Sequence, residues 1–263
     1  MRRTLIFLSA VVIFTGFLFF EIPVLQRTGA KDVVQSIDDI EIIELSGKTL
    51  FISDLHLITP EVQINLPVEE ISHIVIVGNF FDTQDDFERF GATMQERIGN
   101  ALGVFLQEDF IGNVYFISSL NHDPQLDEFE LEVKGVKFFH VGKIGKFLIG
   151  GTKIIALHGD ELYDGVIGGG ISWLLEKFDI LLPLERLGKA KFNIEKETWF
   201  IVGHSHVPGL DQASRTANTG SFVGVPFNDL IFRIRVGTGI TVKNGKVELV
   251  YFMTPLSAKP YWV

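Results

Sequence analysis

The sequence predicts an α/β sandwich with its functional side chains at the ends of strands. Three observations support this prediction. Short apolar runs recur along the chain, stretches with apolar residues at helical spacing separate some of them, and polar clusters follow five of the runs. Continuous apolar runs are typical of strands buried on both faces. The 263 residues are enough for one large α/β domain or two small ones.

The composition disfavours or excludes several classes of function. Hydrophobic residues make up 46% of the chain and charged residues 21%, which indicates a globular body. The formal net charge is −10 and no basic stripe is visible, so we do not expect a nucleic-acid partner. An acidic body is compatible with the binding of metal cations. The absence of cysteine excludes disulfides, thiolate metal sites and cysteine nucleophiles.

Residues 1–26 predict an N-terminal membrane anchor. Arg2 and Arg3 precede the uncharged run 5–20, which approaches the length of about 20 residues that a membrane span needs. A cleaved signal peptide is the alternative, but no cleavage site of the A-x-A type is present. A buried soluble helix fits less well because every face is apolar. We expect a single-pass membrane protein. The two arginines favour a main domain on the external side of the membrane, but the side is left open.

Residues 27–47 are expected to form a linker and entry segment before the main domain, 48–263. The expected strands are, in order, 49–53, 74–77, 114–118, 136–141, 153–157, 199–202, 231–236, 239–243 and 246–252. Asn244 and Gly245, between the last two strands, are typical of a type I′ hairpin turn. Apolar residues recur at helical spacing in 85–110 and in 170–187, which predicts helices there.

Five polar clusters each follow an apolar run, and together they hold five of the seven histidines. The clusters are Ser53-Asp54-Leu55-His56, Gly78-Asn79-Phe80-Phe81-Asp82, Leu120-Asn121-His122-Asp123, Leu157-His158-Gly159-Asp160 and Gly203-His204-Ser205-His206. Parallel strands end at the same edge of a sheet, so these loops can converge there. On an extended segment Asp54 and His56 would face the same way, as would His204 and His206. Imidazole and carboxylate ligands suit zinc, manganese or iron.

The order D-x-H, G-[D]-x-x-D, [G]-N-H-[D/E], H and G-H-x-H resembles that of the calcineurin-like metallophosphoesterases, from about residue 49 to residue 206. This resemblance implies a four-layer α/β/β/α sandwich that holds two divalent metals, manganese, zinc or iron, bridged by water. It also implies hydrolysis of a phosphate ester or pyrophosphate, with metal-activated water as the nucleophile. Two metals about 3.5–4 Å apart can lower the pKa of such a water and hold the phosphoryl oxygens.

The resemblance also assigns roles to individual residues. The six ligands fall into two sets, the first made of Asp54, His56 and His206 and the second of Asn121, His158 and His204. His122 would stabilise the transition-state oxygens or protonate the leaving group, with Asp123 orienting it. Asp82 and Asp160 would support the ligands through hydrogen bonds. The two remaining histidines match no motif and are expected to be structural: His73 and His140.

Asn79 departs from the pattern, because the family places a bridging aspartate at this position. An amide oxygen can ligate one metal, but it is a poor bridge and carries no charge. Two divalent ions about 4 Å apart repel by roughly 17 kcal/mol at an effective dielectric of about 20. Three interpretations follow: two ions with a weak second site, one ion with reduced activity, or a non-catalytic binding domain. Leu120, at a position where the family has glycine, is a second departure.

Two segments bear on the substrate. Val207-Pro208-Gly209 and Asn218-Thr219-Gly220-Ser221 are similar to the branch that contains UDP-2,3-diacylglucosamine diphosphatase. This similarity implies a phosphorylated small-molecule or lipid substrate, such as a nucleotide-lipid pyrophosphate. Residues 159–198 lie where that branch inserts a cap for acyl chains, so they are a candidate cap. The helix 170–187 within them either packs in the core or faces lipid.

Two other functions remain as alternatives. The first is a membrane-tethered binding protein whose metal site is weakened or inactive because of Asn79. The second is a nuclease or protein phosphatase of the same fold, and the acidic net charge makes the nuclease less expected.

Overall fold

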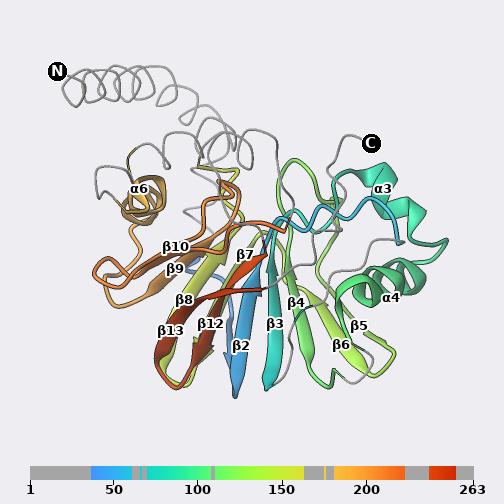
Figure 1. Ribbon diagram of the computed structural model, residues 1–263, viewed down its shortest axis with the longest axis horizontal. Helices are drawn as coiled ribbons and strands as arrows, with labels where there is room; N and C mark the ends of the chain where they lie inside the picture. Colours follow the sequence, from blue (N-terminus) through green and yellow to red (C-terminus); the bar gives the residue numbers. More distant parts are fainter. Residues whose placement is uncertain are drawn as a thin grey trace.

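The computed structural model describes residues 37–60, 66, 70–107, 110–162, 175, 181–222 and 237–252. Within these residues, two mixed β-sheets pack face to face (Figure 1). The α/β sandwich predicted from the sequence is therefore confirmed.

The larger sheet has seven strands among the described residues. In spatial order they are β13 (Lys246–Tyr251), β12 (Thr238–Lys243), β2 (Lys48–Ile52), β3 (Ile71–Val77), β4 (Asn113–Ile117), β6 (Val136–His140) and β5 (Phe129–Val133). The four strands β2, β3, β4 and β6 are parallel, whereas β12, β13 and β5 pair antiparallel with their neighbours. The loops that follow β2, β3 and β4 therefore leave the sheet from the same edge.

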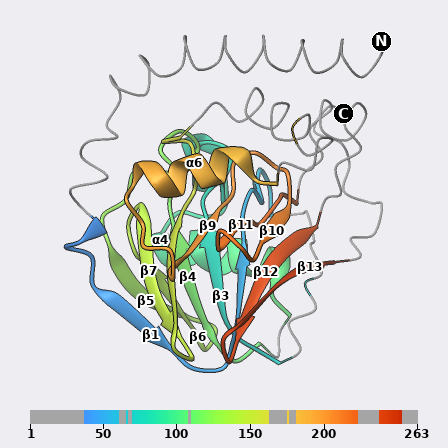
Figure 2. The same cartoon turned by 90° about the vertical axis from the view of Figure 1, so that its left-hand side faces the viewer.

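The smaller sheet has six strands in the part of the chain that is described. In spatial order they are β1 (Ile42–Leu45), β7 (Ile144–Ile149), β8 (Thr152–Leu157), β9 (Trp199–Val202), β11 (Thr216–Asn218) and β10 (Gly209–Asp211). β8, β9 and β11 are parallel, and β1 is parallel to β7. β7 runs antiparallel to β8, and β10 antiparallel to β11. Figure 2 shows β1 and β5 at one edge of the sandwich and β13 at the opposite edge.

Several strands were not predicted from the sequence. β1 lies in the segment expected to be a linker, and its alternating exposure gives only a weak strand signal. β5 alternates glutamate with apolar residues at the edge of the larger sheet, and a glycine and a lysine interrupt β7. β10 and β11 are three residues each, which is too short for a periodic pattern. The type I′ turn is confirmed, because Asn244 and Gly245 have φ of +49° and +81° between two paired strands.

The stretch 85–110 forms two helices rather than one. α3 (Gln84–Arg89) begins after Thr83, whose side chain accepts a hydrogen bond from the N–H of Asp86. α4 (Met94–Phe105) begins after Thr93, which forms a capping box with Glu96. The capping box starts a second helix within the stretch of regularly spaced apolar residues. The spacing alone could therefore not show where one helix ends and the next begins.

The second predicted helix is described only in part. α6 (Pro183–Lys191) begins four residues before the predicted end at 187 and continues beyond it. Proline is favoured in the first turn because its missing N–H has no partner there in any helix.

Among the described residues, three apolar clusters hold the layers together. Phe51 and Phe147 belong to a cluster that fills the space between the sheets. A second cluster packs α3 and α4 against the outer face of the larger sheet, and a third packs α6 against the smaller one. Figure 1 shows α6 on one side of the sandwich and α3 and α4 on the other. The described elements thus form the layers helix, sheet, sheet and helix.

Two phenylalanines anchor the loop after β3. Phe80 and Phe81 are both fully buried. The Phe80 ring meets Phe105 at 5.8 Å, and the Phe81 ring meets Phe87 at 4.9 Å, measured between ring centroids. Each buried ring contributes about 1.5–3 kcal/mol through removal of apolar surface from water. The helices therefore fix the position of the loop that carries Asn79.

Some predictions lie outside the described residues. They are the anchor 1–26, residues 27–36 of the entry segment, the strand 231–236, and most of 163–180 within the candidate cap. No helix in the described portion of the chain is long and apolar enough to cross a membrane.

Candidate metal centre

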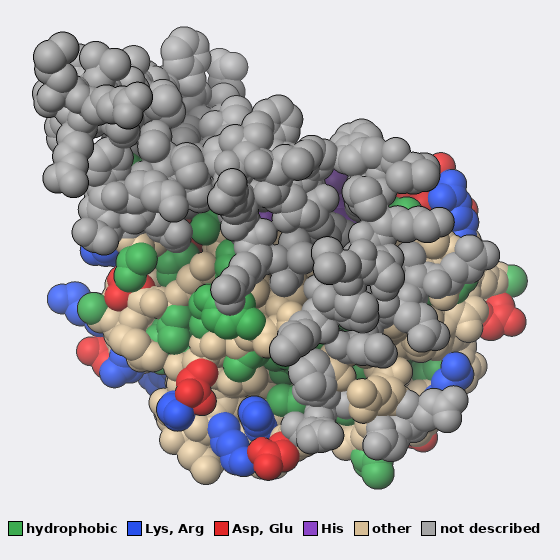
Figure 3. Space-filling model, viewed as in Figure 1, with side chains coloured by type: hydrophobic (Ala, Val, Ile, Leu, Met, Phe, Trp, Pro, Cys, Tyr) green, Lys and Arg blue, Asp and Glu red, His purple; other side chains and the backbone are tan. Residues whose placement is uncertain are grey.

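The polar clusters meet at the ends of the parallel strands. The loops after β2 and β3 are joined by a hydrogen bond from the N–H of His56 to the carbonyl of Asn79, at 2.9 Å. The loops after β8 and β9 are joined by a bond of 2.9 Å from the N–H of Gly203 to the carbonyl of His158. Figure 3 shows histidine side chains reaching the surface at the top of the face in view. The convergence expected from the sequence is therefore present.

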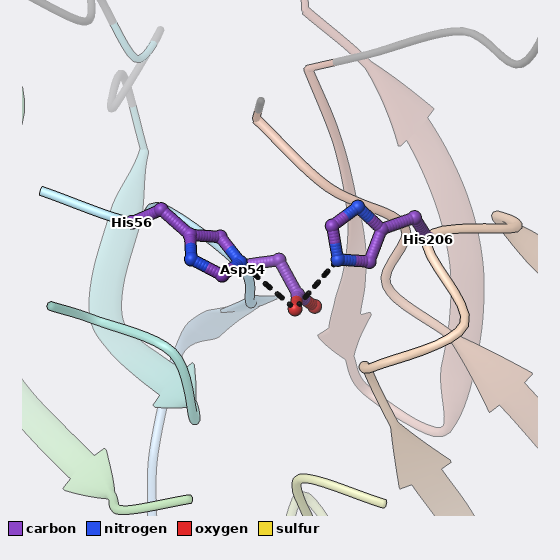
Figure 4. Close-up of side chains that lie close together, drawn as sticks. All are labelled: Asp54, His56 and His206. Atoms are coloured by element: carbon purple, nitrogen blue, oxygen red, sulfur yellow. Dashed lines mark ion pairs between the residues drawn. The ribbon is translucent and has the colours of Figure 1, made fainter. Parts of the chain in front are cut away.

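The carboxylate of Asp54 lies at the centre of this cluster and is fully buried. Its Oδ1 atom faces four side-chain nitrogens. They are Asn79 Nδ2 at 3.0 Å, His206 Nε2 at 3.1 Å, His56 Nε2 at 3.7 Å and His158 Nε2 at 3.8 Å. Figure 4 shows the rings of His56 and His206 pointing at this oxygen from opposite sides.

The other carboxylate oxygen of Asp54 is held by its surroundings. Oδ2 accepts hydrogen bonds from the hydroxyl of Ser53 and from the N–H of His204, the latter at 3.0 Å. The Ser53 hydroxyl also contacts the hydroxyl of Thr219 at 2.6 Å. These contacts fix the carboxylate so that Oδ1 points into the cluster.

Five of the candidate ligands have left-handed backbone conformations. The φ angles are +55° for Asp54, +44° for His56, +49° for Asn79, +64° for His204 and +59° for His206. Such angles are uncommon outside glycine and are found at functional sites, where the surrounding structure must hold them. Asp54 and His56 themselves have left-handed backbone conformations. The expectation that they lie on an extended segment was therefore wrong.

The expected first ligand set is brought together. The ligand atoms of Asp54, His56 and His206 lie within 4.8 Å of one another. The carboxylate of Asp82 accepts a hydrogen bond of 2.8 Å from His56 Nδ1, which turns His56 Nε2 toward the cluster. Asp82 therefore takes the supporting place expected for it. Among the described residues, the ligand atoms of His56, Asp82 and His122 also lie within 4.8 Å of one another. His56 and Asp82 in this second group are the two residues joined by the hydrogen bond above.

The expected second set is only partly assembled. His158 donates from Nδ1 to the carbonyl of Val77 at 2.9 Å, and its Nε2 lies 3.2 Å from Nδ1 of His204. Asn121 is exposed, and its side chain donates to the Asp160 carboxylate at 3.3 Å. Asp160 thus contacts Asn121 as expected, and among the described residues no further histidine or carboxylate completes a compact metal group with these two histidines.

The expectation that Asp123 orients His122 was wrong. The Asp123 carboxylate is buried and accepts four backbone hydrogen bonds of 2.8–3.0 Å, from the N–H groups of Asn79, Phe80, Phe81 and Ser119. These bonds occupy both of its oxygens and hold the loop after β3. His122 instead donates from Nδ1 to the carbonyl of Asp82 at 2.9 Å, with the Asp82 carboxylate 3.7 Å away.

A buried polar network that the sequence did not reveal supports the loop of His204 and His206. The amide nitrogen of Asn218 donates to the carbonyl of Gly203 at 2.8 Å and to Glu185 Oε1 at 2.9 Å. Asn218 and Glu185 are fully buried. Asn218 belongs to the N-x-G-S segment noted in the sequence. Glu185 lies in a helix that was predicted from the spacing of its apolar residues, and that spacing gives no signal for a buried glutamate.

The two remaining histidines bind backbone carbonyls away from this cluster. His73 donates to the carbonyl of Ser46 at 2.9 Å, and His140 donates to the carbonyl of Asp127 at 2.8 Å. These contacts agree with structural roles for both residues.

The buried charges shift the pKa values in the cluster. Burial acts to raise the pKa of Asp54, but the neighbouring His206 and His158 outweigh it and hold the pKa well below its usual range. Burial acts to lower the pKa of His56, but Asp54 and Asp82 raise it to about 9. Burial, together with the charge of His158, lowers the pKa of His204 to about 4. The imidazole of His204 is therefore neutral at physiological pH.

The raised pKa of His56 predicts that metal binding depends on pH. Without metal, this ion pair stabilises the fold below about pH 6.5 and the contribution is lost as the pH rises through about 9. A metal bound at His56 displaces the proton, so its apparent affinity should rise about tenfold per pH unit below pH 9. Titration calorimetry in buffers of different ionisation enthalpy measures both the affinity and the protons released. An affinity that does not change with pH would contradict the prediction.

Comparison with known proteins shows a coarse likeness to a number of solved structures. No family model and no curated protein matches the chain. Vacuolar Protein Sorting 29 from Cryptosporidium parvum is 16% identical, with a TM-score of 0.40 over 78% of this chain and 96% of that one. Vps29 from Entamoeba histolytica, complexed with zinc, is 14% identical, with a TM-score of 0.38 over 77% of this chain and 97% of that one. A predicted phosphoesterase from Streptococcus pneumoniae is 14% identical, with a TM-score of 0.32 over 78% and 89%.

Proposed function

We propose that the protein is a metal-dependent phosphoesterase that hydrolyses a phosphate ester or pyrophosphate. The observation that supports this most is the set of Asp54, His56 and His206, whose ligand atoms lie within 4.8 Å of one another at the ends of parallel strands. The carboxylate of Asp82 orients one ligand of this set, and His122 lies beside it, where a substrate can reach.

The donor set fits a divalent metal. One carboxylate and two imidazoles suit manganese, zinc or iron. Nδ1 of His206 is buried without a hydrogen-bond partner among the described residues. Nε2 of the same ring faces Asp54 Oδ1. A divalent ion held there would supply Lewis acidity to the phosphoryl oxygens and to the attacking water.

The residues of the chain itself hold the reacting groups in place. Asp54 and His56 are kept in orientation by Ser53 and Asp82, so the site is organised before substrate arrives. The side chain of His122 is 40% exposed, and its Nδ1 is engaged by the carbonyl of Asp82. Nε2 of His122 is then the atom that contacts a phosphoryl oxygen or holds the proton for the leaving group.

Replacement of His122 by alanine is expected to lower kcat by about 10²–10⁴-fold. The metal content and the free energy of unfolding should stay near those of the wild type, because His122 is partly exposed and does not belong to the first ligand set. Steady-state kinetics and metal analysis on the same preparation measure both quantities.

His73→Ala is the matched control, because it removes a histidine that contacts only the carbonyl of Ser46 and Tyr115 among the contacts described. Its kcat should change less than twofold. Loss of metal from His122→Ala would show that His122 is a ligand instead.

A cavity beside the cluster supports a substrate with an apolar part. Its volume is about 1450 Å³, and it reaches from Asn121 and Asp160 down to the strands β1 and β5. Its lining includes six large apolar side chains: Ile40, Ile43, Leu120, Phe129, Phe139 and Ile144. Six carboxylates and two lysines, Lys143 and Lys146, also line it, and the excess of negative charge disfavours a polyanionic leaving group. A lipid-linked phosphoester therefore fits better than a free nucleotide, and an anchor at 1–26 would hold the site near a bilayer.

The alternative function is a metal-site protein without catalytic activity. It is favoured by one observation, that the amide nitrogen of Asn79 faces Asp54 Oδ1 where the family resemblance expects a carboxylate. Such a protein would keep the fold and the ligand cluster without turnover.

Hydrolysis of bis-p-nitrophenyl phosphate separates the two functions. The full chain, supplied in turn with manganese, zinc and iron(II), is expected to release nitrophenol only with a bound metal, and a chelator should abolish this release. The His73→Ala chain should behave like the wild type. Bound metal without turnover on diesters, monoesters and pyrophosphates would favour the inactive alternative, and the absence of any bound metal would sink both.

A further inference from the structure

We propose that the centre binds one divalent ion per chain, at Asp54, His56 and His206, and that Asn79 is a positioning residue for Asp54 rather than a metal ligand. This inference rests on the proposed function only in requiring that the site binds metal. It concerns the number of ions and the role of one side chain, so it can fail while the phosphoesterase proposal stands.

The orientation of the Asn79 amide follows from its neighbours. Its Nδ2 atom lies 3.0 Å from Asp54 Oδ1, and an ionised carboxylate oxygen can only accept a hydrogen bond. The atom facing Asp54 is therefore the amide nitrogen, and the carbonyl oxygen Oδ1 is buried with no partner among the described residues. The side that could ligate an ion thus points away from Asp54.

The backbone of Asn79 holds this arrangement. The residue is 2% exposed, and its N–H donates to the buried carboxylate of Asp123 at 2.8 Å. The adjoining Phe80 and Phe81 are fully buried between the sheet and the helices, so the loop cannot easily move toward a second ion. The left-handed φ of +49° is one that asparagine adopts more readily than most residues.

The charge of the donor groups also favours a single ion. Asp54 is the only carboxylate among the ligands that the family resemblance implies, since the others are imidazoles and amides. Asp82 is engaged by His56, and Asp160 by the N–H groups of Leu120 and Asn121. Loss of one unit charge about 4 Å from a divalent ion weakens its binding by about a millionfold at an effective dielectric of about 20. The second ion should therefore bind at least about a thousandfold more weakly than the first.

The second set is satisfied without an ion. His158 Nε2 and His204 Nδ1 lie 3.2 Å apart, at hydrogen-bonding distance, so each nitrogen has a partner in the absence of an ion. Asn121 is held at the exposed rim by Asp160. In the first set, His56 and His206 both face one oxygen of Asp54, a carboxylate that supplies the negative charge that the second set lacks.

Counting the ions tests the proposal without measuring activity. The full chain is equilibrated with manganese, freed of unbound metal, and analysed for metal and protein by mass spectrometry. We expect one ion in the wild type and an electron paramagnetic resonance spectrum of isolated Mn²⁺. Asn79→Asp restores a carboxylate at the bridging position, so it should bind two ions and show the spectrum of a coupled pair.

Two further variants make the outcomes distinct. Asn79→Ala removes the amide without adding charge, so it should still bind one ion, with an affinity about 10–100-fold lower because Asp54 loses its donor. His204→Ala should also keep one ion. Two ions in the wild type, or one ion in Asn79→Asp that folds normally by circular dichroism, would overturn the inference and leave the phosphoesterase proposal intact. A folded wild type that binds no ion would overturn the phosphoesterase proposal as well.

Discussion

Replacement of Asp54 by asparagine is expected to abolish both metal binding and hydrolysis while the chain stays folded. The change converts Oδ1, the atom faced by His56, His158 and His206, into an amide nitrogen, which cannot ligate a metal. The remaining carbonyl oxygen can still accept from the Ser53 hydroxyl and the N–H of His204, which preserves the local structure. Metal affinity should fall by more than the ~10–100-fold that loss of an outer partner costs.

Asp82→Asn is the matched control for this prediction, because it changes a carboxylate of the same cluster by the same chemistry. Asp82 orients His56 and does not belong to the first ligand set, so its loss should lower metal affinity by only about 10–100-fold. Titration calorimetry with manganese, together with turnover of a nitrophenyl diester, ranks the two variants. Retention of wild-type metal affinity by Asp54→Asn would refute the assignment of the centre.

Replacement of Asp123 by alanine is expected to lower the free energy of unfolding by about 4 kcal/mol. Four backbone N–H groups lose their acceptor at once, and they belong to the loops that carry Asn79 and follow β4. The site is buried, so water cannot replace the carboxylate without opening the structure. This effect would be structural, in contrast to the catalytic role expected from the sequence.

Asp127→Ala serves as its control, because it removes an exposed carboxylate from the segment that follows the same loop. A surface substitution of this kind usually changes stability by less than about 0.5 kcal/mol. Urea denaturation followed by circular dichroism measures both variants against the wild type. If Asp123→Ala proved as stable as Asp127→Ala, the loop would not depend on the buried carboxylate.

Five of the strands that could be predicted share one property. β2, β3, β4, β8 and β9 are central strands, and burial on both faces requires continuous apolar runs that can be read in a single sequence. β1 and β5 are edge strands, and β10 and β11 are very short, so their sequences carry little periodic signal. Their pairing depends on neighbours that are distant in the chain.

The candidate site could be predicted in composition but not in contacts. The spacing of Asp54 and His56 indicated a shared target, although the left-handed backbone that brings them together has no sequence signature of its own. Asp123 follows His122 in the chain, and adjacency suggested a partnership. The fold instead turns the carboxylate of Asp123 inward to the loop after β3 and leaves His122 to Asp82.

The sequence by itself determined which residues could hold a metal and that they would follow buried strands, because apolar runs and polar clusters are local properties of the chain. Only the tertiary structure decided which of these side chains meet. His56 and His206 are 150 positions apart in the chain, yet both face one oxygen of Asp54. They meet because the parallel strands of the two sheets end at the same edge of the sandwich. The orientation of the Asn79 amide was likewise decided there, since it follows from the acceptor that the fold places 3.0 Å away.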